Sequence, residues 1–421
     1  MIFKVHVVIE KMVYSMFRQE YFSMDMKQVR LQYPGRVSKE EVIRNTHPAK
    51  FVVVKEFVYS RPLVDDGWRN LLIYGDNLPI LRALLDDPRV KGKVVLVYLD
   101  PPFGTGGVFR GAKHVSSRSD DEIAYRDMPL SPAYLEFLRR GLLMIRELMA
   151  EEGSIYVHID VDAAHYVKIL MDEVFGIENF VNEITRVKCN PKNFERKAYG
   201  NIKDTIMYYA KNYGKQVWNE PREPYTDEDI VRLFPKVDEN GRRYTTVPLH
   251  APGETINGAT GQAWRGLLPP PGRHWRYPPE VLDELDKKGL IEWSSTGNPR
   301  LKIYADEYIK KGKRMQDVWL NYKDPPYPRY PTEKNLDMVM KIVETSSRRG
   351  DIVLDAFCGS GTTAVAAEKL GRRWICIDIS PVAIETAVRR LLEIEKRSPF
   401  LLINATGSPL PERLERLIKD V

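Results

Sequence analysis

Apolar residues recur in two alternating patterns from Asn70 onward. Short runs rich in Val, Ile and Leu predict strands at residues 70–76, 93–100, 154–160, 180–187 and 204–210. Between them, stretches at 77–87, 132–153 and 163–176 place apolar residues every three or four positions, which indicates amphipathic helices. The alternation resumes late in the chain, with helices predicted at 334–347, 362–371 and from Ser380, and strands at 351–357 and 372–379. Strands that alternate with helices predict an α/β fold built on a mostly parallel sheet.

The alternation breaks down between Asn219 and Arg329. This stretch is rich in Pro, Gly and Trp and contains one clear short helix, at 279–289. A long irregular insert in a compact domain is more often a functional module than a connection. We therefore expect an N-terminal extension of unknown role at 1–60, a first half-domain at 61–216, a target-recognition insert at 217–329 and a second half-domain at 330–421.

A glycine-rich turn stands in the second half, in the stretch DIVLDAFCGSGTT. A strand leads into Asp355, Gly359 and Gly361 follow, and a helix begins near Thr362, so backbone N–H groups can face a ligand. No Gly-Lys-Ser/Thr follows, which excludes a Walker loop, whereas the glycine spacing alone leaves a dinucleotide fingerprint open. An acid at Asp355 would repel a pyrophosphate but attract the ammonium and sulfonium of S-adenosylmethionine. Asp378, which ends the next predicted strand, stands where an acid accepts hydrogen bonds from ribose hydroxyls; the alternative is that both acids only form turns.

The predicted strands need a particular order to build one site. Too few residues follow Asp378 to complete a doubly wound sheet, so the first half of the chain must supply the remaining strands. In a circularly permuted sheet, residues 71–76 provide the third strand and residues 94–100 the fourth. This order brings Asp76 near the adenine of the cofactor and Asp100 to the same ligand-binding edge.

Two Asp-Pro-Pro-aromatic stretches compete for the catalytic role, at 100–103 and 324–327. Asp100 ends a buried strand, whereas Asp324 follows an irregular stretch in which nothing fixes its position against the cofactor turn, so we expect the second copy to be a turn whose similarity is coincidental. Prolines lock φ and lack N–H donors, so the Asp100 carboxylate and the Pro101 carbonyl can face a ligand as fixed acceptors. Such acceptors match the exocyclic amino group of a nucleobase flipped out of a duplex, with Phe103 stacked on the base.

Composition and charge narrow the class of partner. The 421 residues are 43% hydrophobic and 29% charged, with no apolar run long enough for a membrane span and no secretory signal, so we expect a cytoplasmic protein. Three cysteines without ligand spacing, and the isolated His158 and His165, predict no metal site. Residues 186–216 carry eight Lys or Arg against two acids, a surplus equal to the net charge of +6. A charge run by itself is more often a solvated face, but beside a base-modifying site we expect phosphate contacts from Lys188, Lys192, Arg196 and Lys197.

In this order, the motifs resemble the beta class of DNA amino-methyltransferases, which includes type III modification subunits. The resemblance runs from about Leu71 to Arg390 and rests on YGDNLPILRAL, VYLDPPFGTGG, YVHIDVDAAHYVKILMDEVFGIENFVNEI, YPTEKN and DIVLDAFCGSGTTAVAAEKLGRRWICIDIS. It implies a permuted, Rossmann-like sheet that uses S-adenosylmethionine, with a target-recognition region between the two halves. Two departures, Asn335 and Ala356 where the family usually has proline, remove no ligand group.

The resemblance also assigns residues and a substrate. It implies a catalytic tetrapeptide of Asp100, Pro101, Pro102 and Phe103. With the residues argued above, the expected cofactor site comprises Asp76, Thr332, Lys334, Asp355, Phe357, Gly359, Ser360, Gly361, Thr362 and Asp378. Asp at the head of the tetrapeptide is usual in N6-adenine members and Ser in N4-cytosine members, so adenine in double-stranded DNA is favoured.

Three functions remain open from the sequence. The first is a DNA adenine N6-methyltransferase. The second is transfer to another amino group, cytosine N4 in DNA or a base in RNA. The third is a DNA-recognition subunit whose transfer activity is absent or needs a partner such as a restriction subunit. A homodimer, which beta-class enzymes often form, is also left open.

Overall fold

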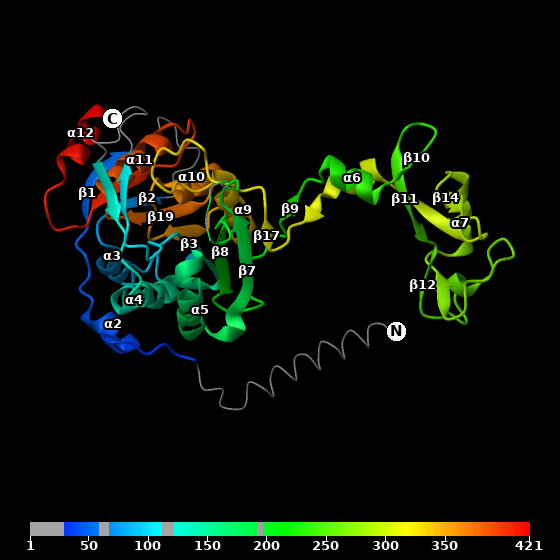
Figure 1. The fold of residues 1–421 in the computed structure, drawn as a ribbon, viewed down its shortest axis with the longest axis horizontal. Helices are drawn as coiled ribbons and strands as arrows, with labels where there is room; N and C mark the ends of the chain where they lie inside the picture. The colour runs from blue at the N-terminus through cyan, green and yellow to red at the C-terminus, as the bar shows by residue number, and fades with distance from the viewer. Residues whose placement is uncertain (1–28, 59–66, 112–121, 192, 194, 196) are drawn as a thin grey trace. The chain divides into compact units, whose positions relative to one another are not determined.

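The computed structural model of the chain describes residues 29–58, 67–111, 122–191, 193, 195 and 197–421. The chain divides into two compact units (Figure 1). The first ends at Asn219 and resumes at Gln316, and the second spans Glu220–Met315. Each unit has its own sheet and its own core.

A ten-stranded sheet forms the centre of the first unit. In spatial order its strands are β1 (Val52–Phe57), β20 (Phe400–Asn404), β2 (Asn70–Tyr74), β19 (Arg373–Asp378), β18 (Ile352–Asp355), β3 (Val94–Leu99), β6 (Met149–Ile159), β8 (Lys203–Ala210), β7 (Phe180–Val187) and β17 (Val318–Trp319). The run from β20 to β6 is parallel, β8 is antiparallel to both of its neighbours, and β1 is antiparallel at the far edge. The predicted α/β fold with a mostly parallel sheet is confirmed.

The two halves of the chain interleave in this sheet. β18, which leads into the glycine turn, lies between β19 from the second half and β3 from the first. β2, also from the first half, pairs with the other side of β19. The strand order is therefore the permuted one that the sequence predicts. It brings the carboxyl ends of β2, β3, β18 and β19 to one edge of the sheet.

Helices cover both faces of this sheet (Figure 1). On one face α4 (Pro132–Leu148) packs between α3 (Asn77–Leu84) and α5 (Val161–Phe175), and on the other α10 (Thr362–Lys369) packs between α9 (Leu336–Ser346) and α11 (Pro381–Leu392). The core between the sheet and α3 to α5 includes Val97, Leu142 and Ile155, all nearly inaccessible to solvent. Smaller elements complete the unit: α2 (Lys39–Asn45), β4 (Val108–Gly111), β5 (Glu122–Arg126), η1 (Ile177–Asn179) and α12 (Glu412–Asp420).

The boundary between α4 and β6 differs from the prediction. The helix was expected to reach residue 153, but it ends at Leu148 and β6 begins at Met149. The register between β3 and β6 shifts in this region, and the backbone closes so tightly that a Cβ on Gly153 would lie 2.9 Å from the carbonyl oxygen of Ala150. Pairing with β3 therefore outweighs the helical pattern of the local sequence.

The described part of the N-terminal extension, residues 29–58, packs on the first unit. β1 pairs with β20 at the sheet edge, and Arg36 forms an ion pair with Glu173 of α5 at 2.6 Å. β20 itself was not predicted, because no strand was expected after residue 379. A five-residue apolar run near a chain end gives no periodicity that distinguishes a strand from a helix.

The second unit is more regular than the insert that the sequence suggested. It contains a four-stranded antiparallel sheet and two strand pairs: β10 (Lys236–Val237), β11 (Arg243–Pro248), β15 (Pro299–Tyr304) and β14 (Ile291–Trp293); β12 (His250–Pro252) with β13 (Arg273–Trp275); and β9 (Arg222–Glu223) with β16 (Lys313–Arg314). Its helices are α6 (Asp227–Leu233), η2 (Ala259–Gly261), α7 (Pro279–Lys287), α8 (Ala305–Tyr308) and η3 (Ile309–Lys311). Trp264 and Trp275 meet edge to face in a small core with Leu249, Leu282 and Ile291. Tertiary packing of tryptophans stabilises strands too short to be recognised in the sequence.

The compact second unit is also narrower than the predicted segment 217–329. Residues 316–329 belong to the first unit, where β17 pairs with β7 and extends the large sheet. Within the described residues, no helix is both long enough and apolar enough to cross a membrane.

Candidate active site

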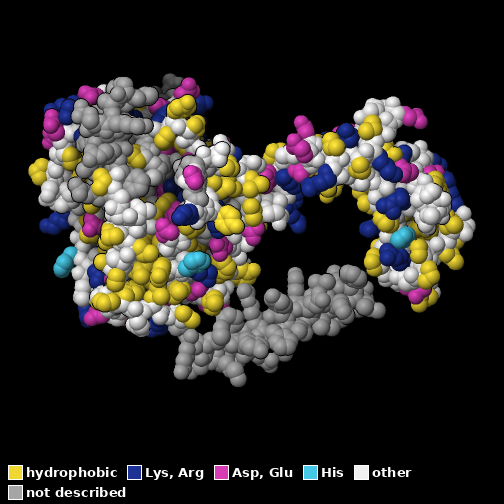
Figure 2. Space-filling view, in the orientation of Figure 1, with side chains coloured by type: hydrophobic (Ala, Val, Ile, Leu, Met, Phe, Trp, Pro, Cys, Tyr) yellow, Lys and Arg dark blue, Asp and Glu magenta, His cyan; other side chains and the backbone are white. Residues whose placement is uncertain are grey.

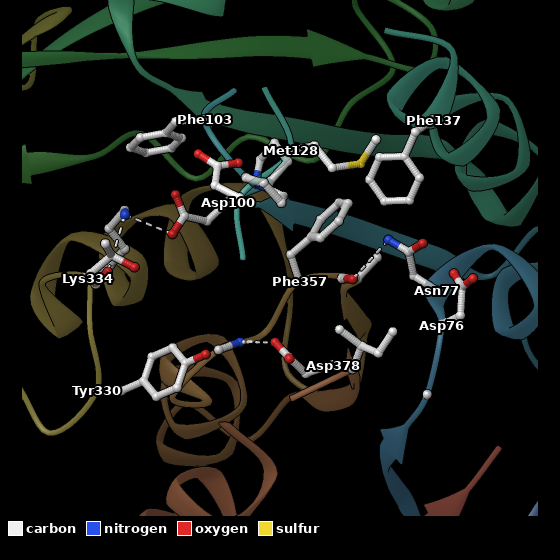
Figure 3. Close-up of a pocket in the computed structure, with 18 residues that line it drawn as sticks. Asp76, Asn77, Asp100, Phe103, Met128, Phe137, Tyr330, Lys334, Phe357 and Asp378 are labelled. Atoms are coloured by element: carbon white, nitrogen blue, oxygen red, sulfur yellow. Dashed lines mark hydrogen bonds and ion pairs between the residues drawn. The ribbon is translucent and has the colours of Figure 1, made fainter. Parts of the chain in front are cut away.

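A cavity of about 300 Å³ opens at the carboxyl ends of β2, β3, β18 and β19. Open α/β sheets bind their ligands at this edge. Figure 3 shows Asp100, Phe103 and Lys334 toward one end of the cavity and Asp76 and Asn77 toward the other. The remaining lining residues are Gly75, Pro101, Pro102, Asp127, Met128, Phe137, Tyr330, Thr332, Ala356, Phe357, Gly359, Asp378 and Ile379.

The two carboxylate oxygens of Asp100 have different environments. Oδ2 lies 2.8 Å from Nζ of Lys334, a side chain that is itself buried. Oδ1 is also buried, and among the described residues it has no hydrogen-bond partner. A buried acceptor without a donor is unfavourable, by about 1 to 3 kcal/mol for a neutral group and more for a charged one. Oδ1 therefore needs an N–H or O–H donor from a ligand in the cavity.

Helix α4 restrains the two prolines that follow Asp100. The hydroxyl of Tyr134, a fully buried residue, donates to the carbonyl oxygen of Pro102 at 2.5 Å. Because both prolines also have fixed φ, the Asp100 side chain and the Pro101 carbonyl start from a rigid backbone. A rigid backbone orients acceptors before a ligand arrives.

Asp127 fixes the turn that follows Phe103. Its carboxylate accepts from the backbone N–H of Thr105 at 2.8 Å and from the Thr105 hydroxyl at 2.6 Å. The Phe103 ring has the Lys334 ammonium 4.9 Å from its centroid, a cation–π distance. Lys334 thus contacts both ends of the predicted catalytic tetrapeptide.

A buried polar network lies next to this tetrapeptide. Nδ1 of His158 is 2.9 Å from the Tyr98 hydroxyl, and Nε2 is 3.1 Å from Oδ2 of Asp204. Burial lowers the pKa of His158, so the ring is neutral at pH 7 and its two nitrogens can accept from Tyr98 and donate to Asp204. The Phe103 ring lies 6.2 Å from the His158 ring. His158 occupies a structural position, as expected, whereas His165 is exposed on α5.

Asp355 lies beside the main cavity rather than in its lining, and its contact with the cofactor stays a prediction. The residue is 2% exposed. Its Oδ2 accepts from the Thr363 hydroxyl at 2.5 Å and its Oδ1 from the backbone N–H of Phe357 at 3.0 Å. Burial raises the pKa of Asp355 to about 7. Asp355 therefore shapes the glycine turn from within, and it reaches only a small adjoining pocket.

Helix α11 packs against the glycine turn and forms hydrogen bonds with it. Nη1 of Arg390 donates to Oγ of Ser360 at 2.7 Å and to Oγ1 of Thr362 at 2.9 Å. Gly361 has φ of +76°, and a Cβ there would lie 2.7 Å from the Cβ of Ala387, so only glycine fits. Of the predicted cofactor residues, Ser360 and Thr362 line the small pocket that adjoins the main cavity, whereas Gly361 lines neither.

Gly359 and Asp378, by contrast, both line the cavity. The backbone N–H of Gly359 donates to Oδ2 of Asp378 at 2.7 Å, and that of Ser380 donates to Oδ1 at 2.8 Å. Burial raises the pKa of Asp378 to about 6. Each carboxylate oxygen has a second lone pair, so both can still accept from a ligand hydroxyl.

The groups at the other end of the cavity fit the nucleoside part of S-adenosylmethionine. Asp76 caps α3 by accepting from a backbone N–H, and Asn77 directly after it has a buried Oδ1 with no partner among the described residues. The rings of Phe137 and Phe357 meet edge to face at 5.9 Å and supply an apolar wall (Figure 3). Acceptors beside an aromatic wall suit ribose hydroxyls and the amino group of adenine.

Thr332 and Lys334 were expected to hold the methionine end of the cofactor. Both line the cavity. Thr332 adopts φ of +61°, a conformation unusual for a β-branched residue and more frequent at functional sites. Lys334, however, directs its ammonium to Asp100, so its observed contact is with the catalytic stretch.

A model of the family described as DNA methylase matches residues 94–389 of the chain. This chain belongs to the DNA methylase family. The chain is accordingly an S-adenosylmethionine-dependent DNA methyltransferase, as the glycine turn and the Asp-Pro-Pro-Phe stretch together predict.

Two relatives show how far the similarity of this methylase extends. It is 42% identical over 368 residues to the type II methyltransferase M.EcaI of Enterobacter cloacae. The aligned region covers 86% of this chain and 77% of that protein. The methylase is 23% identical over 386 residues to the EcoP15I Mod subunit, a type III restriction-modification protein of Escherichia coli, covering 75% of this chain and 58% of the subunit. The methylase therefore spans less than two thirds of that Mod subunit.

The solved structures that resemble this chain have lower sequence identity to it than these two relatives. The PvuII DNA methyltransferase (cytosine-N4-specific) is 14% identical, with a TM-score of 0.41 over 87% of this chain and 95% of that chain. The M1.HpyAVI–SAM complex is 18% identical, with a TM-score of 0.40 over 76% of this chain and 98% of that chain.

The residues predicted to contact phosphates have different environments in the methylase. Lys188 is not available, because its Nζ lies 2.7 Å from Asp160 and 2.8 Å from Asp204, which balance its charge. Burial alone would raise the pKa of Asp204, but hydrogen bonds from His158 and Lys188 outweigh it and lower that pKa. Lys197 is exposed, and its contact with DNA stays a prediction. Lys192 and Arg196 lie outside the described residues.

The second Asp-Pro-Pro stretch of the methylase is anchored by an ion pair that lies away from the cofactor turn. Oδ1 of Asp324 forms an ion pair with Nη2 of Arg186, a side chain with no solvent exposure. Nε of Arg186 donates to the carbonyl oxygen of Tyr322 at 2.8 Å, and Nη1 lies 3.4 Å from Asp204. This copy is held to Arg186 of β7 and has a structural position, and it lines no part of the main cavity.

Several site residues were missed by the sequence analysis. Asn77, Asp127, Tyr134 and Phe137 all contribute to the cavity or its support. Asn77 could have been found, because it directly follows the predicted Asp76 in a quoted motif. The other three lie in sequence far from any motif, and tertiary contacts with the stretch after β3 bring them to the site: Tyr134 of α4 bonds to Pro102, and Asp127 bonds to Thr105. Within the described residues, no group of His, Cys, Asp and Glu could hold a metal ion.

Proposed function

We propose that this methylase transfers a methyl group to N6 of adenine within a specific sequence of double-stranded DNA. The observation that carries the proposal is Oδ1 of Asp100, a buried acceptor to which no group of the described residues donates. An adenine amino group supplies the missing N–H donor. The identity to M.EcaI, a type II methyltransferase, and the Asp at the head of the tetrapeptide support the same conclusion.

The chemistry rests on holding the amino group between two fixed acceptors. Oδ1 of Asp100 accepts one N–H of the amino group and the Pro101 carbonyl accepts the other, which localises the lone pair on nitrogen. Lys334 and the Tyr134–Pro102 hydrogen bond keep both acceptors in place. Such preorganised electrostatics stabilise the transition state rather than the ground state.

The base must leave the duplex to reach this position, at a cost of a few kcal/mol. Phe103 offers a ring for stacking beside the acceptors, which offsets part of that cost. Bound S-adenosylmethionine supplies an electrophilic methyl group on a sulfonium. Asp100 then takes the proton that nitrogen loses when the new N–C bond is complete.

The cofactor is proposed to lie between Asn77 and Lys334, along the cavity. In this arrangement Asp378 accepts from the ribose hydroxyls, and Asp76 and Asn77 face the adenine. Phe357, Gly359 and Thr332 line the path between them. Asp355, Ser360 and Thr362 line the small pocket that adjoins this path, and Gly361 allows the turn beside it.

The remaining predictions concern partners and place. We propose that the second unit, Glu220–Met315, reads the DNA sequence, because it is a separate compact unit inserted between the two halves of the methylase sheet. A cytoplasmic location, a homodimer and a restriction subunit as partner are retained as parts of the same proposal.

The test is transfer of labelled methyl groups from S-adenosylmethionine to unmethylated genomic DNA, followed by analysis of the nucleosides. Label in N6-methyladenine is expected. Label in N4-methylcytosine would show that the substrate is cytosine in DNA, and label in RNA alone would show that the substrate is RNA. Cofactor binding without any transfer would identify a subunit that needs a partner.

A further inference from the structure

Most arginines of the second unit have a carboxylate within ion-pair distance: Arg222, Arg232, Arg242, Arg265 and Arg314. Arg243 has none and donates to the carbonyl oxygen of Phe234, and Arg273, Arg276 and Arg300 have none either within residues 220–315, all of which the structure describes. Unpaired arginines that are scattered are ordinary surface residues. Arg273, Arg276 and Arg300, however, gather around one histidine.

That histidine, His250, opens β12 and lies half-buried beside the three guanidinium groups. Nη1 of Arg273 is 3.2 Å from its Nδ1. Strand pairing brings the other two close: Arg276 follows Trp275, the partner of His250, and Arg300 pairs with Pro248, two residues before His250. Burial, together with the charges of Arg273, Arg276 and Arg300, lowers the pKa of His250, in accord with this placement. On the second unit, Figure 2 shows a histidine side chain among Lys and Arg side chains on the face in view.

Hydrogen bonds orient two of these arginines without neutralising them. Nε of Arg276 donates to the carbonyl oxygen of Pro248 at 2.9 Å. Nε and Nη2 of Arg300 donate to the hydroxyl and the carbonyl oxygen of Thr246, both at 2.8 Å. Neutral acceptors thus hold the guanidinium groups, and the charges stay uncompensated.

The nearest carboxylate by strand register is already engaged. Glu292 on β14 stands opposite Arg300 on β15. Its two oxygens bind Lys236 and the hydroxyl of Tyr244. Three like charges held together by the fold repel one another, and an anion placed among them relieves that repulsion.

We propose that Arg273, Arg276 and Arg300 form a binding site for the phosphate backbone of the DNA substrate. Guanidinium groups bind phosphate oxygens through paired N–H donors, and partly immobilised ones lose less entropy on binding. Phosphate contacts set the register and orientation of a protein on a duplex without reading bases. The site would hold the second unit on the duplex while other residues read the sequence. This inference rests on the proposed function.

The test compares the full chain with the variant Arg273→Gln/Arg276→Gln, which leaves Arg300 and its strand-crossing hydrogen bonds in place. Binding to a fluorescent DNA duplex of random sequence is measured by anisotropy between about 50 and 200 mM salt. We expect affinity to fall about tenfold or more, and the slope of log K against log salt to shrink by about 2, one unit for each lost phosphate contact.

Two further variants separate charge from folding. Lys310→Gln/Lys311→Gln removes the same charge from two exposed lysines near β16, and its salt slope should stay close to wild type. Arg273→Lys/Arg276→Lys keeps the charge and should keep most of the slope. An unchanged slope in the glutamine variant, a loss shared equally with the lysine-pair control, or a preference for an RNA duplex over DNA would overturn the inference.

The same preparations distinguish this inference from the proposed function. S-adenosylmethionine binding, measured by calorimetry, should be unchanged in all variants. If the wild type binds DNA but transfers no methyl group, the proposed function fails. If the wild type methylates DNA and the glutamine variant binds as tightly as it does, only the phosphate site fails.

Discussion

The two Asp-Pro-Pro-aromatic stretches have nearly the same sequence and opposite environments. Asp100 follows a buried parallel strand and lines a cavity, and one of its carboxylate oxygens has no hydrogen-bond partner in the part of the chain that the structure describes. Asp324 lies in a loop and gives its carboxylate to the buried Arg186. A short motif therefore does not determine chemistry by itself. The strand in front of it decides whether its acceptors face a ligand or another part of the protein.

The sharpest test of this comparison is removal of Asp100. Asp100→Ala deletes the acceptor aimed at the base, so methyl transfer should fall by about 10³-fold or more, by analogy with loss of a transition-state hydrogen bond. Cofactor affinity should remain. Transfer of labelled methyl groups and calorimetry measure the two quantities. Asp100→Ala with wild-type activity would assign the chemistry elsewhere.

Lys334→Met tests whether the first stretch depends on its ion pair. Without the ammonium at 2.8 Å, the Asp100 carboxylate loses its fixed orientation, and kcat should fall about ten- to hundredfold. Lys341→Met on α9 removes a lysine that pairs only with Glu344 at the surface, and it provides the matched control. Equal effects of the two variants would contradict a role for Lys334 at the site.

Asn77→Leu tests the other buried acceptor of the cavity. Deleting Oδ1 should weaken S-adenosylmethionine binding about tenfold, the value of one neutral hydrogen bond. Calorimetry measures the dissociation constant, and the melting temperature is recorded in parallel because Asn77 also donates to the Ala356 carbonyl. An unchanged dissociation constant at an unchanged melting temperature would place the adenine elsewhere.

The second stretch should affect stability rather than chemistry. Asp324→Ala leaves Arg186 buried with Asp204 and a carbonyl as its remaining partners, so unfolding free energy should drop by about 1 to 2 kcal/mol. Denaturant titration measures it, and kcat at saturating substrate should stay near wild type. A loss of kcat as large as that of Asp100→Ala, in a folded protein, would erase the distinction between the two copies.

The smallest expected effect is a change in the pH dependence of stability. The pKa of Asp355 is raised to about 7, so the folded state holds a proton that the unfolded state releases near pH 4. Stability from this residue is therefore present at low pH and is lost as pH rises toward and through 7. Asp355→Asn removes that loss, so the melting temperature of the variant relative to wild type should increase from pH 5 to pH 8. A constant difference would show that Asp355 does not titrate in this window.

Sequence reasoning reached the sheet, the permuted strand order and the catalytic stretch because each has a strong local signal. Runs such as Val94 to Leu99 are apolar throughout, and a buried parallel strand requires that pattern. It did not predict the hydrogen-bond and ion-pair partners of Asp355, Lys188 and Asp324, for one shared reason. Each is a charged residue, and charge alone does not reveal whether it faces solvent, a ligand or a partner within the protein.

The sequence by itself determined the fold class, the methylase family and the position of Asp100, since strand periodicity, glycine spacing and prolines act within a few residues. Tertiary structure alone decided which carboxylates are available to a ligand. Asp355 accepts from Thr363, Lys188 pairs with Asp160 and Asp204, and Asp324 pairs with Arg186. Oδ1 of Asp100, by contrast, has no donor among the residues whose structure is described. The physical reason is that hydrogen bonding and burial depend on neighbours in space, which a pattern along the chain does not contain.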